Sequence, residues 1–221
     1  MLLLALDTSA AAGAALHDGT SVVAERSVHD PTRHAEVLMP FVREVLADVG
    51  ASPADLTAVA VGVGPGPFTG LRVGLVTART LGHALGLDVH GVCSLDALAA
   101  QGFGALDDDE LVVATDARRR EVYWARYRRE GAGFARVAGP QVGAAADVRV
   151  DGAVCVGRGA HLYPDALPGP DGGPLDPSPG ALGGLAARSL AGDGGWLVPT
   201  DPLYLRRPDV QEPGARKRVR T

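Results

Sequence analysis

The sequence has few of the residues that build disulfide frameworks and metal sites. It contains only two cysteines, Cys93 and Cys155, which stand alone and far apart. Isolated cysteines at this separation give no metal-ligand spacing and are typical of a chain kept in a reducing compartment. Lys217 is the only lysine, so arginine carries nearly all of the positive charge. We interpret this bias as the codon usage of a GC-rich genome rather than as a functional feature.

Long hydrophobic runs and an excess of positive charge are also missing. No basic residue precedes the apolar opening Met1–Leu4, and Asp7 ends the run, which is unlike a signal peptide. No stretch is long enough to span a bilayer, so we expect a cytoplasmic chain without membrane contact. A net charge of −5 argues against wholesale coating of nucleic acid. With 221 residues, one large domain or two small lobes can bury a substantial core.

A glycine-rich segment, residues 62–74, is the most informative part of the chain. It follows an apolar, β-rich stretch (56–61) and precedes a helical pattern, which predicts a strand–loop–helix junction. Such junctions often hold phosphate. A P-loop, however, needs Lys and then Ser or Thr after its last glycine, and Leu71 and Arg72 stand there. The dinucleotide spacing G-x-G-x-x-G also fails, and two prolines remove N–H donors. We therefore predict a loop built for rigid shape rather than for cradling phosphate.

The first half of the chain has an ordered series of strand and helix patterns. A continuous apolar run ends at Asp7, and an Asp18-Gly19 turn signal joins the next two strands into a hairpin. Apolar residues at helical spacing then predict a helix. Ser94 is expected to cap the last helix of this half. The predicted strands are 2–6, 11–17, 21–27, 56–61 and 89–92, and the predicted helices are 34–49, 71–85 and one that starts near residue 95.

The second half repeats this order. An apolar run (111–115) ends at Asp116, a hairpin and a strand follow, and Gly157-Arg158-Gly159 faintly echoes the glycine loop. The repeat predicts an α/β fold with two ribonuclease-H-like lobes, of the acetate-and-sugar-kinase, Hsp70 and actin class. We expect an N-terminal lobe over 1–100 and a smaller lobe with a basic tail over 101–221. The second lobe is expected to be eroded, because proline and glycine dominate 167–180. The predicted strands of this half are 111–115, 121–127, 134–137 and 154–156.

Four segments carry a family resemblance. Gly64–Gly74 resembles the GPGSFTGLRIG signature of the bacterial TsaB family. Leu4–Ser9 resembles the opening strand of that family, Asp116–Tyr123 its DAR-x-x-EVY segment, and Pro202–Arg206 its C-terminal P-x-YLR. The four occur in the family's order and span nearly the whole chain. Pro67 departs from the pattern, because the family usually has a small hydroxyl residue there; any capping or binding by that hydroxyl is lost.

The resemblance implies a non-catalytic subunit in the synthesis of threonylcarbamoyladenosine in tRNA. Proteins of this family bind and activate the transferase TsaD, which modifies the adenosine beside the anticodon, and the ATPase TsaE resets the complex. The resemblance implies that this chain alone holds no cofactor, metal or catalytic residue, that ATP and metal belong to partner subunits, and that tRNA is met through the complex. The signature-loop residues are Gly64, Gly66, Phe68, Thr69 and Arg72.

A stripe of small residues marks the predicted second helix. Gly74, Ala78 and Gly82 recur at every fourth position, which lets another helix approach closely. Glycine inside a helix lowers stability by about 1 kcal/mol relative to alanine, so the two glycines in this helix call for an explanation. One reason is a partner, and the other is tight packing on the protein's own sheet. The resemblance favours contact with TsaD, or with a second copy, through first-lobe helices. The expected interface comprises Arg33, Val37, Phe41, Gly70, Leu71, Gly74, Leu75, Ala78 and Gly82.

The alternative is an enzyme of the same fold, such as a small kinase, ATPase or metallopeptidase. Asp7 and Asp116 end first strands, where catalytic members of this fold class hold magnesium or position phosphate; the other interpretation is that they cap backbone N–H groups. TsaD carries an H-x-x-x-H metal pair, and Ser94 and Leu98 occupy the corresponding positions here. Leucine cannot ligate a metal, so catalytic metal binding is not expected.

Three further groups of polar residues are open to two interpretations. His34 and Glu36 match a His-x-Glu of the family, and are either functional or merely exposed in the first turn of a helix. Arginines beside Tyr123-Trp124, and arginines in the tail, predict direct tRNA contact; the alternative is a solvated strand edge and tail. The candidate RNA-contacting residues are Arg118, Arg119, Arg120, Arg216 and Arg218.

Overall fold

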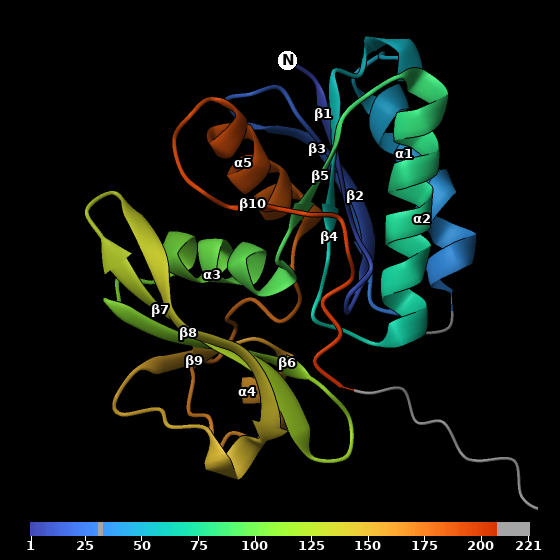
Figure 1. The fold of residues 1–221 in the computed structure, drawn as a ribbon. Helices are drawn as coiled ribbons and strands as arrows, with labels where there is room; N and C mark the ends of the chain where they lie inside the picture. Colours follow the sequence, from blue (N-terminus) through green and yellow to red (C-terminus); the bar gives the residue numbers. More distant parts are fainter. Residues whose placement is uncertain (31–32, 207–221) are drawn as a thin grey trace, which may run out of the picture.

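Two β-sheets lie end to end in a computed structural model that describes residues 1–30 and 33–206 (Figure 1). The first sheet has the strand order β10-β5-β4-β1-β2-β3 and the second the order β8-β7-β6-β9. The first comprises β1 (Leu3–Asp7), β2 (Ala12–His17), β3 (Val22–Val28), β4 (Ala58–Gly62), β5 (Val89–Val92) and β10 (Leu197–Val198). The second comprises β6 (Glu110–Asp116), β7 (Glu121–Glu130), β8 (Gly133–Ala144) and β9 (Val154–Val156).

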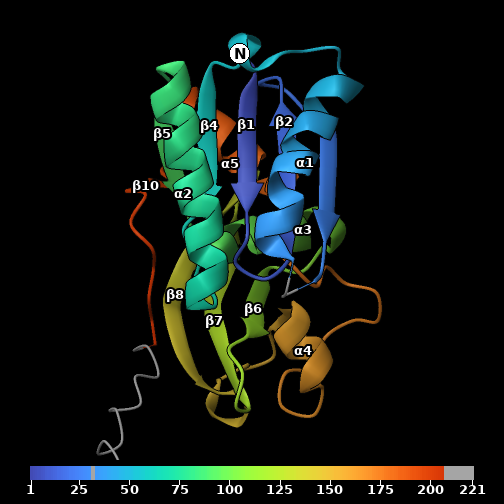
Figure 2. The same ribbon diagram turned by 90° about the vertical axis from the view of Figure 1, so that its right-hand side faces the viewer.

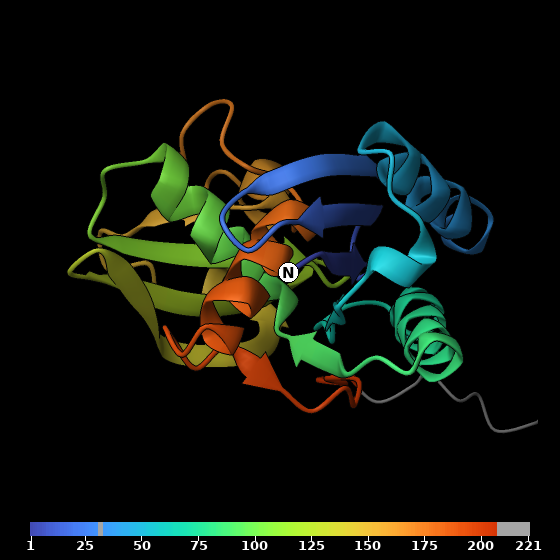
Figure 3. The same ribbon diagram turned by 90° about the horizontal axis from the view of Figure 1, so that it is seen from above.

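Helices cover both faces of the first sheet. Helices α1 (His34–Asp48) and α2 (Phe68–Leu85) lie side by side on one face, and α5 (Pro179–Leu190) lies on the other (Figures 1 and 3). Side chains alternate across β1, so Leu4 and Leu6 pack towards α1 and α2 while Leu3 and Ala5 pack towards α5. Burial on both faces explains why β1 reads as a continuous apolar run.

The second sheet also has a helix on each face. Helix α3 (Ser94–Ala105) packs against the face that looks towards the first sheet, and α4 (Arg158–Leu162) covers the opposite face. Along β6, Leu111 and Val113 join the cluster under α3, while Val112 and Ala114 join the one under α4. Within the described residues, no helix is long and apolar enough to cross a bilayer.

The first strands of the two sheets have the same pattern of pairing, which confirms the predicted fold class. β1 pairs antiparallel with β2 and parallel with β4, and β6 pairs in the same way with β7 and β9. The second unit lacks two elements of the first. No α-helix stands between β8 and β9 where the first unit has α1, and neither helix nor strand occurs over 163–178. The second of these gaps lies in the proline- and glycine-rich stretch.

Two elements near the C-terminus belong to the first unit and not to the second. Both α5 and β10 pack on the first sheet, although a division at residue 100 assigns them to the second lobe. One cap prediction is wrong: α3 begins at Ser94 itself, its N-cap is Cys93, and no side chain caps it. The Ser94 hydroxyl is used elsewhere.

Candidate functional site

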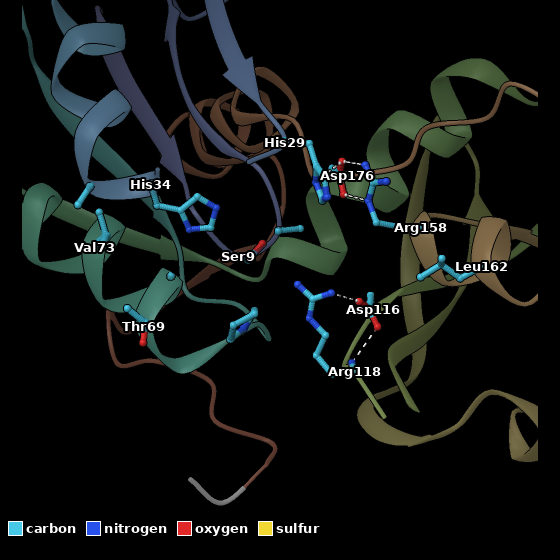
Figure 4. Close-up of a pocket in the computed structure, with 14 residues that line it drawn as sticks. Ser9, His29, His34, Thr69, Val73, Asp116, Arg118, Arg158, Leu162 and Asp176 are labelled. Atoms are coloured by element: carbon cyan, nitrogen blue, oxygen red, sulfur yellow. Dashed lines mark hydrogen bonds and ion pairs between the residues drawn. The ribbon is translucent and has the colours of Figure 1, made fainter. Parts of the chain in front are cut away.

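The carboxyl end of β1 points towards the second unit (Figure 2), and the cleft that lies there is lined by Ser9, just after β1, and by Asp116, at the end of β6 (Figure 4). The cavity there has a volume of about 440 Å³. The first unit contributes the turn after β1, the end of β3 and the first turns of α1 and α2, and the second unit contributes the end of β6, α4 and the loop before α5. The lining residues are Ser9, Ala10, His29, His34, Ala35, Pro67, Thr69, Gly70, Val73, Asp116, Arg118, Arg158, Leu162 and Asp176.

Asp7 does not reach this cleft. It is 1% exposed, and its Oδ1 accepts hydrogen bonds from the Ser9 N–H at 2.7 Å and the Ser9 hydroxyl at 2.6 Å. The Ser94 hydroxyl donates to Oδ2 at 2.6 Å. A Cβ at Gly62 would lie 1.9 Å from Oδ2, so only glycine fits beside the carboxylate. Burial raises the pKa of Asp7, and these hydrogen bonds oppose that rise. Of the two interpretations, the capping role describes Asp7.

The two positions that match the partner's histidine pair are also internal. Ser94 Oγ, besides donating to Asp7, accepts the N–H of Gly64 at 3.2 Å. Leu98 is completely buried, in the cluster under α3. Over residues 1–30 and 33–206, no group of three or more His, Cys, Asp and Glu side chains could hold a metal ion.

Asp116 lies in the cleft and organises a left-handed turn. Its Oδ1 accepts the N–H of Arg118 at 2.8 Å, and its Oδ2 lies 3.0 Å from Arg118 Nη1. Arg118, Arg119 and Arg120 have φ values of 64°, 55° and 64°. Three consecutive L-residues in this conformation cost roughly 1–2 kcal/mol each. Strain of this kind persists where the surrounding structure holds it, often beside functional sites.

Asp176 binds two segments of the cleft together. Its Oδ1 accepts a hydrogen bond from Arg158 Nε at 2.9 Å, and a second contact joins Arg158 Nη2 to Oδ2. His29 Nδ1, from the end of β3, lies 3.2 Å from Oδ2. The hydrogen bond to Asp176 raises the pKa of Arg158. The long loop before α5 is therefore attached to both units at this point.

His34 is buried rather than exposed. It is 7% exposed at the start of α1, and its Nε2 has no hydrogen-bond partner. The ring packs on Gly70, where a Cβ would lie 3.0 Å from Nδ1. Burial lowers the pKa of His34, partly opposed by a hydrogen bond with the backbone of Ala10. The expectation of an exposed first turn is wrong for His34 and correct for Glu36, which pairs with Arg33 at 3.3 Å.

The signature loop has a buried half and an exposed half. Gly64 has φ of 95°, and a Cβ on Gly66 would lie 2.5 Å from the carbonyl oxygen of Ser9, so both glycines are structural. Phe68, Thr69 and Arg72 are exposed. The Arg72 guanidinium lies 3.7 Å from the centre of the Phe68 ring, an arrangement suited to a cation–π contact.

The end of the described chain joins two of the sequence signatures. Tyr204 stacks on Phe68 with ring centres 5.0 Å apart and accepts a hydrogen bond from Arg72 Nε at 3.1 Å. Arg206 donates to the carbonyl oxygen of Ala117 at 2.7 Å and pairs with Glu121. We call Leu203–Arg206 the C-terminal clasp. Sequence reasoning singled out all three motifs but not their convergence.

Most of the predicted partner interface lies inside the chain's own core. Gly74, Ala78 and Gly82 are buried; a Cβ on Gly74 would lie 2.5 Å from Thr8 Oγ1, and one on Gly82 would lie 2.3 Å from Val89 Cγ2. The stripe therefore packs on this protein's own sheet. Gly70, Leu71, Leu75 and Val37 are buried as well, whereas Phe41 is half-buried and Arg33 exposed.

The arginines of the second sheet are mostly engaged in ion pairs. Arg126 and Arg128 both pair with Glu110, at 3.2 and 2.8 Å. Arg118, Arg119 and Arg120 are exposed in the left-handed turn. Arg216 and Arg218 lie outside the described residues. Direct tRNA contact stays a prediction.

Known proteins are similar to this chain in sequence and in fold. The family model "TsaD: tRNA N6-adenosine threonylcarbamoyltransferase" matches residues 27–154. An uncharacterized protein of Mycobacterium tuberculosis (strain ATCC 25618 / H37Rv) is 48% identical over 95% of this chain and 93% of its own length.

Two better described proteins are also similar to the chain. The tRNA threonylcarbamoyladenosine biosynthesis protein TsaB of Escherichia coli (strain K12) is 36% identical over 61% of this chain and 58% of its own length. The crystal structure of YeaZ from Pseudomonas aeruginosa superposes with a TM-score of 0.79 at 31% identity, covering 92% of this chain and 99% of that one.

Proposed function

The chain belongs to the TsaB family, and we propose that it acts as the non-catalytic partner of a TsaD-type transferase in the formation of threonylcarbamoyladenosine in tRNA. The chain binds and activates the transferase, a TsaE-type ATPase joins the complex, and tRNA meets this chain through the complex, in the cytoplasm. ATP and metal belong to the partner subunits.

The observation that carries the non-catalytic part of the proposal is the placement of Asp7. The carboxylate that ends the first strand is 1% exposed and accepts three hydrogen bonds from Ser9 and Ser94, so it has no access to a ligand. The positions that match the histidine pair of TsaD hold Ser94 and Leu98, one bound to Asp7 and the other in the core. A subunit of this kind acts through the geometry or the active population of its partner.

The docking surface that we propose is the outward face of α2. The buried stripe leaves Arg72, Val76 and Arg79 on that face, and Val76 is 62% exposed. An apolar side chain between two arginines suits a protein partner with apolar and acidic groups. The same face can pair two copies of this chain in the absence of TsaD.

One variant tests the surface. Val76→Glu should weaken capture of the TsaD-type partner at least about tenfold, because it places an unpaired charge in the contact, while leaving the melting temperature unchanged. Val137→Glu, at a 42% exposed valine on β8, is the control and should bind normally. Equal binding of the TsaD-type partner by both variants would show that the interface lies elsewhere on the chain.

Depletion tests the function as a whole. Nucleoside mass spectrometry of tRNA from depleted cells should show loss of threonylcarbamoyladenosine while the upstream threonylcarbamoyl adenylate is still made. The purified chain should catalyse nothing alone and yet be required when TsaD, TsaE, the adenylate and tRNA are combined. Normal modification after complete depletion, with no second copy of the gene, would refute the proposal.

A further inference from the structure

The cleft between the two units contains a buried donor or acceptor without a partner. His34 Nε2 is inaccessible and unbonded, the side chain is more than nine-tenths buried, and the ring borders the cavity. A buried polar atom that is left unpaired costs about 1–3 kcal/mol, so native proteins rarely keep one without a reason. A small movement of the ring towards the cavity would let a ligand there supply the missing partner.

The same cavity receives the start of a long helix. Thr69 and Gly70, in the first turn of α2, line it; α2 has 18 residues, no side chain caps its N-terminus, and no acidic residue stands in its first turn. The first N–H groups of a helix have no intrahelical partner and carry a partial positive charge. Such an end attracts oxyanions. The first turn of α1, which also lacks a side-chain cap, borders the cavity through Ala35.

Arg118 faces these groups from the second unit. Only part of its guanidinium is engaged by Asp116; the other end points across the cleft towards Ser9 and His34 (Figure 4). The acidic groups of the cleft are already engaged: Asp116 pairs with Arg118, and Asp176 pairs with Arg158 and also contacts His29. Neither carboxylate is free to hold a divalent cation, which argues against a metal–triphosphate ligand. With both carboxylates engaged, the unengaged end of the Arg118 guanidinium is a donor that an anion without metal could use.

We propose that the interlobe cleft binds a small oxyanion, the phosphate or carboxylate group of a metabolite, between the N-terminus of α2, His34 and Arg118. Guanidinium forks match both groups. Ala10, Val73 and Leu162 give the cavity apolar walls for the body of the ligand, which must fit about 440 Å³. The proposal is independent of partner binding, so either can fail while the other holds.

Amide NMR of the full chain tests the site, with sodium phosphate, and separately sodium acetate, as the probe at constant ionic strength. Saturable shifts should be confined to residues such as Ala35, Thr69, Gly70 and Arg118, with half-saturation at or below about 10 mM for at least one probe. Tighter binding of phosphate assigns the site to phosphate monoesters, and tighter binding of acetate assigns it to carboxylates.

Matched variants distinguish a specific anion site in the cleft from nonspecific electrostatic attraction of anions to the protein. Arg118→Asn removes the guanidinium but tolerates the left-handed backbone, and His34→Gln removes the imidazole; each should weaken binding about tenfold. Arg43→Gln, at an exposed arginine further along α1, should bind as the wild type does. Spectra unchanged away from the cleft verify folding. No saturation by either probe, or equal affinity in Arg118→Asn, His34→Gln and wild type, would overturn the proposal.

Discussion

Asp7 and Asp116 show how the same residue type takes different roles in the two units. Both first strands end in aspartate, but Asp7 is enclosed by Ser9, Ser94 and the glycine loop, whereas Asp116 opens onto the cleft. The difference lies in the neighbours. Gly62 leaves room for the Asp7 carboxylate and Ser94 supplies a donor, and neither requirement can be recognised from strand patterning alone.

A pH comparison tests the burial of Asp7. Because burial raises its pKa above 3.8, the folded state holds this proton more tightly than the unfolded state does. The wild type therefore loses stability as pH rises through the unfolded and then the folded pKa. Asparagine does not titrate, so the free energy of unfolding of Asp7→Asn relative to wild type should increase from about pH 4 to about pH 8 in urea titrations.

Asp55 is the control for that comparison. It is exposed, and hydrogen bonds from the backbone and side chain of Ser52 lower its pKa. Its stabilising effect is present above the unfolded pKa and is lost as pH falls through the folded pKa. Asp55→Asn should thus change in the opposite direction, losing stability relative to wild type as pH rises from the lowered folded pKa of Asp55 to its ordinary value of 3.8, so the urea titrations of this variant extend below pH 4. If the stability of both variants relative to wild type changed in the same direction with rising pH, the raised pKa inferred for Asp7 would be contradicted.

The left-handed turn gives a second prediction at the residue scale. Arg120 is exposed with φ of 64°, so substitutions there act mainly through the backbone. Arg120→Val should lower the free energy of unfolding by about 1–2 kcal/mol, because a β-branched residue disfavours this conformation. Arg120→Gly should change it by less than about 1 kcal/mol, since relieved strain offsets the freedom gained by the unfolded chain. Equal losses in denaturant titrations would mean that the turn is not strained.

Helix α5 shows where element prediction fails. The sequence of residues 179–190 contains three glycines, which oppose a helix. In the structure they allow close packing: a Cβ on Gly180 would lie 2.5 Å from Glu25 Oε2, and one on Gly183 would lie 3.2 Å from Ala5 Cβ. Tertiary contact overrides propensity here. The local signal was Ser178, whose Oγ accepts the N–H of Ala181 as an N-cap, followed by Pro179.

Elements with strong periodicity were predicted well, and the site was not. The helix 34–49 and the hairpin around Asp18-Gly19 match α1, β2 and β3 within a residue or two, because burial on one face imposes the pattern. The predicted second helix starts three residues late, since Phe68–Gly70 belongs to α2. The orphan nitrogen of His34 and the Arg206–Ala117 contact depend on segments far apart in sequence, which no local pattern encodes.

Two glycines in helices should respond in opposite ways to alanine. In α2, a Cβ on Gly74 would lie 2.5 Å from Thr8 Oγ1, which accepts the Gly74 N–H at 3.0 Å and donates to the Gly70 carbonyl at 2.8 Å. Gly74→Ala should cost about 1–3 kcal/mol by overpacking. In α3, Gly104 has open space, so Gly104→Ala should stabilise by up to about 1 kcal/mol. Thermal unfolding measures both; a neutral Gly74→Ala would restore the surface interpretation of the stripe.

At the scale of the whole molecule, the two units are held together from both sides of the cleft. The pair Arg158–Asp176 with His29 closes one side, and the C-terminal clasp closes the other. The clasp brings residues of three sequence motifs into contact, through aromatic stacking of Tyr204 on Phe68 and a hydrogen bond from Arg206 to the backbone of Ala117. The motifs that identify the family therefore also fix the relative position of its two halves here.

Loss of the clasp should loosen the turn that presents Arg118. Arg206→Ala leaves the carbonyl of Ala117, a 3% exposed residue, without its 2.7 Å hydrogen bond and Glu121 without its partner, at a cost of about 1–3 kcal/mol. Amide hydrogen exchange should accelerate over 117–121 while β1 and β4 stay protected, because local opening needs no unfolding of the first sheet. Arg79→Ala is the control: Arg79 contacts Thr200 and Asp201 on the same segment at exposed positions, and its loss should leave residues 117–121 unchanged. Uniform acceleration in Arg206→Ala would show that the clasp supports global stability rather than the geometry of the cleft.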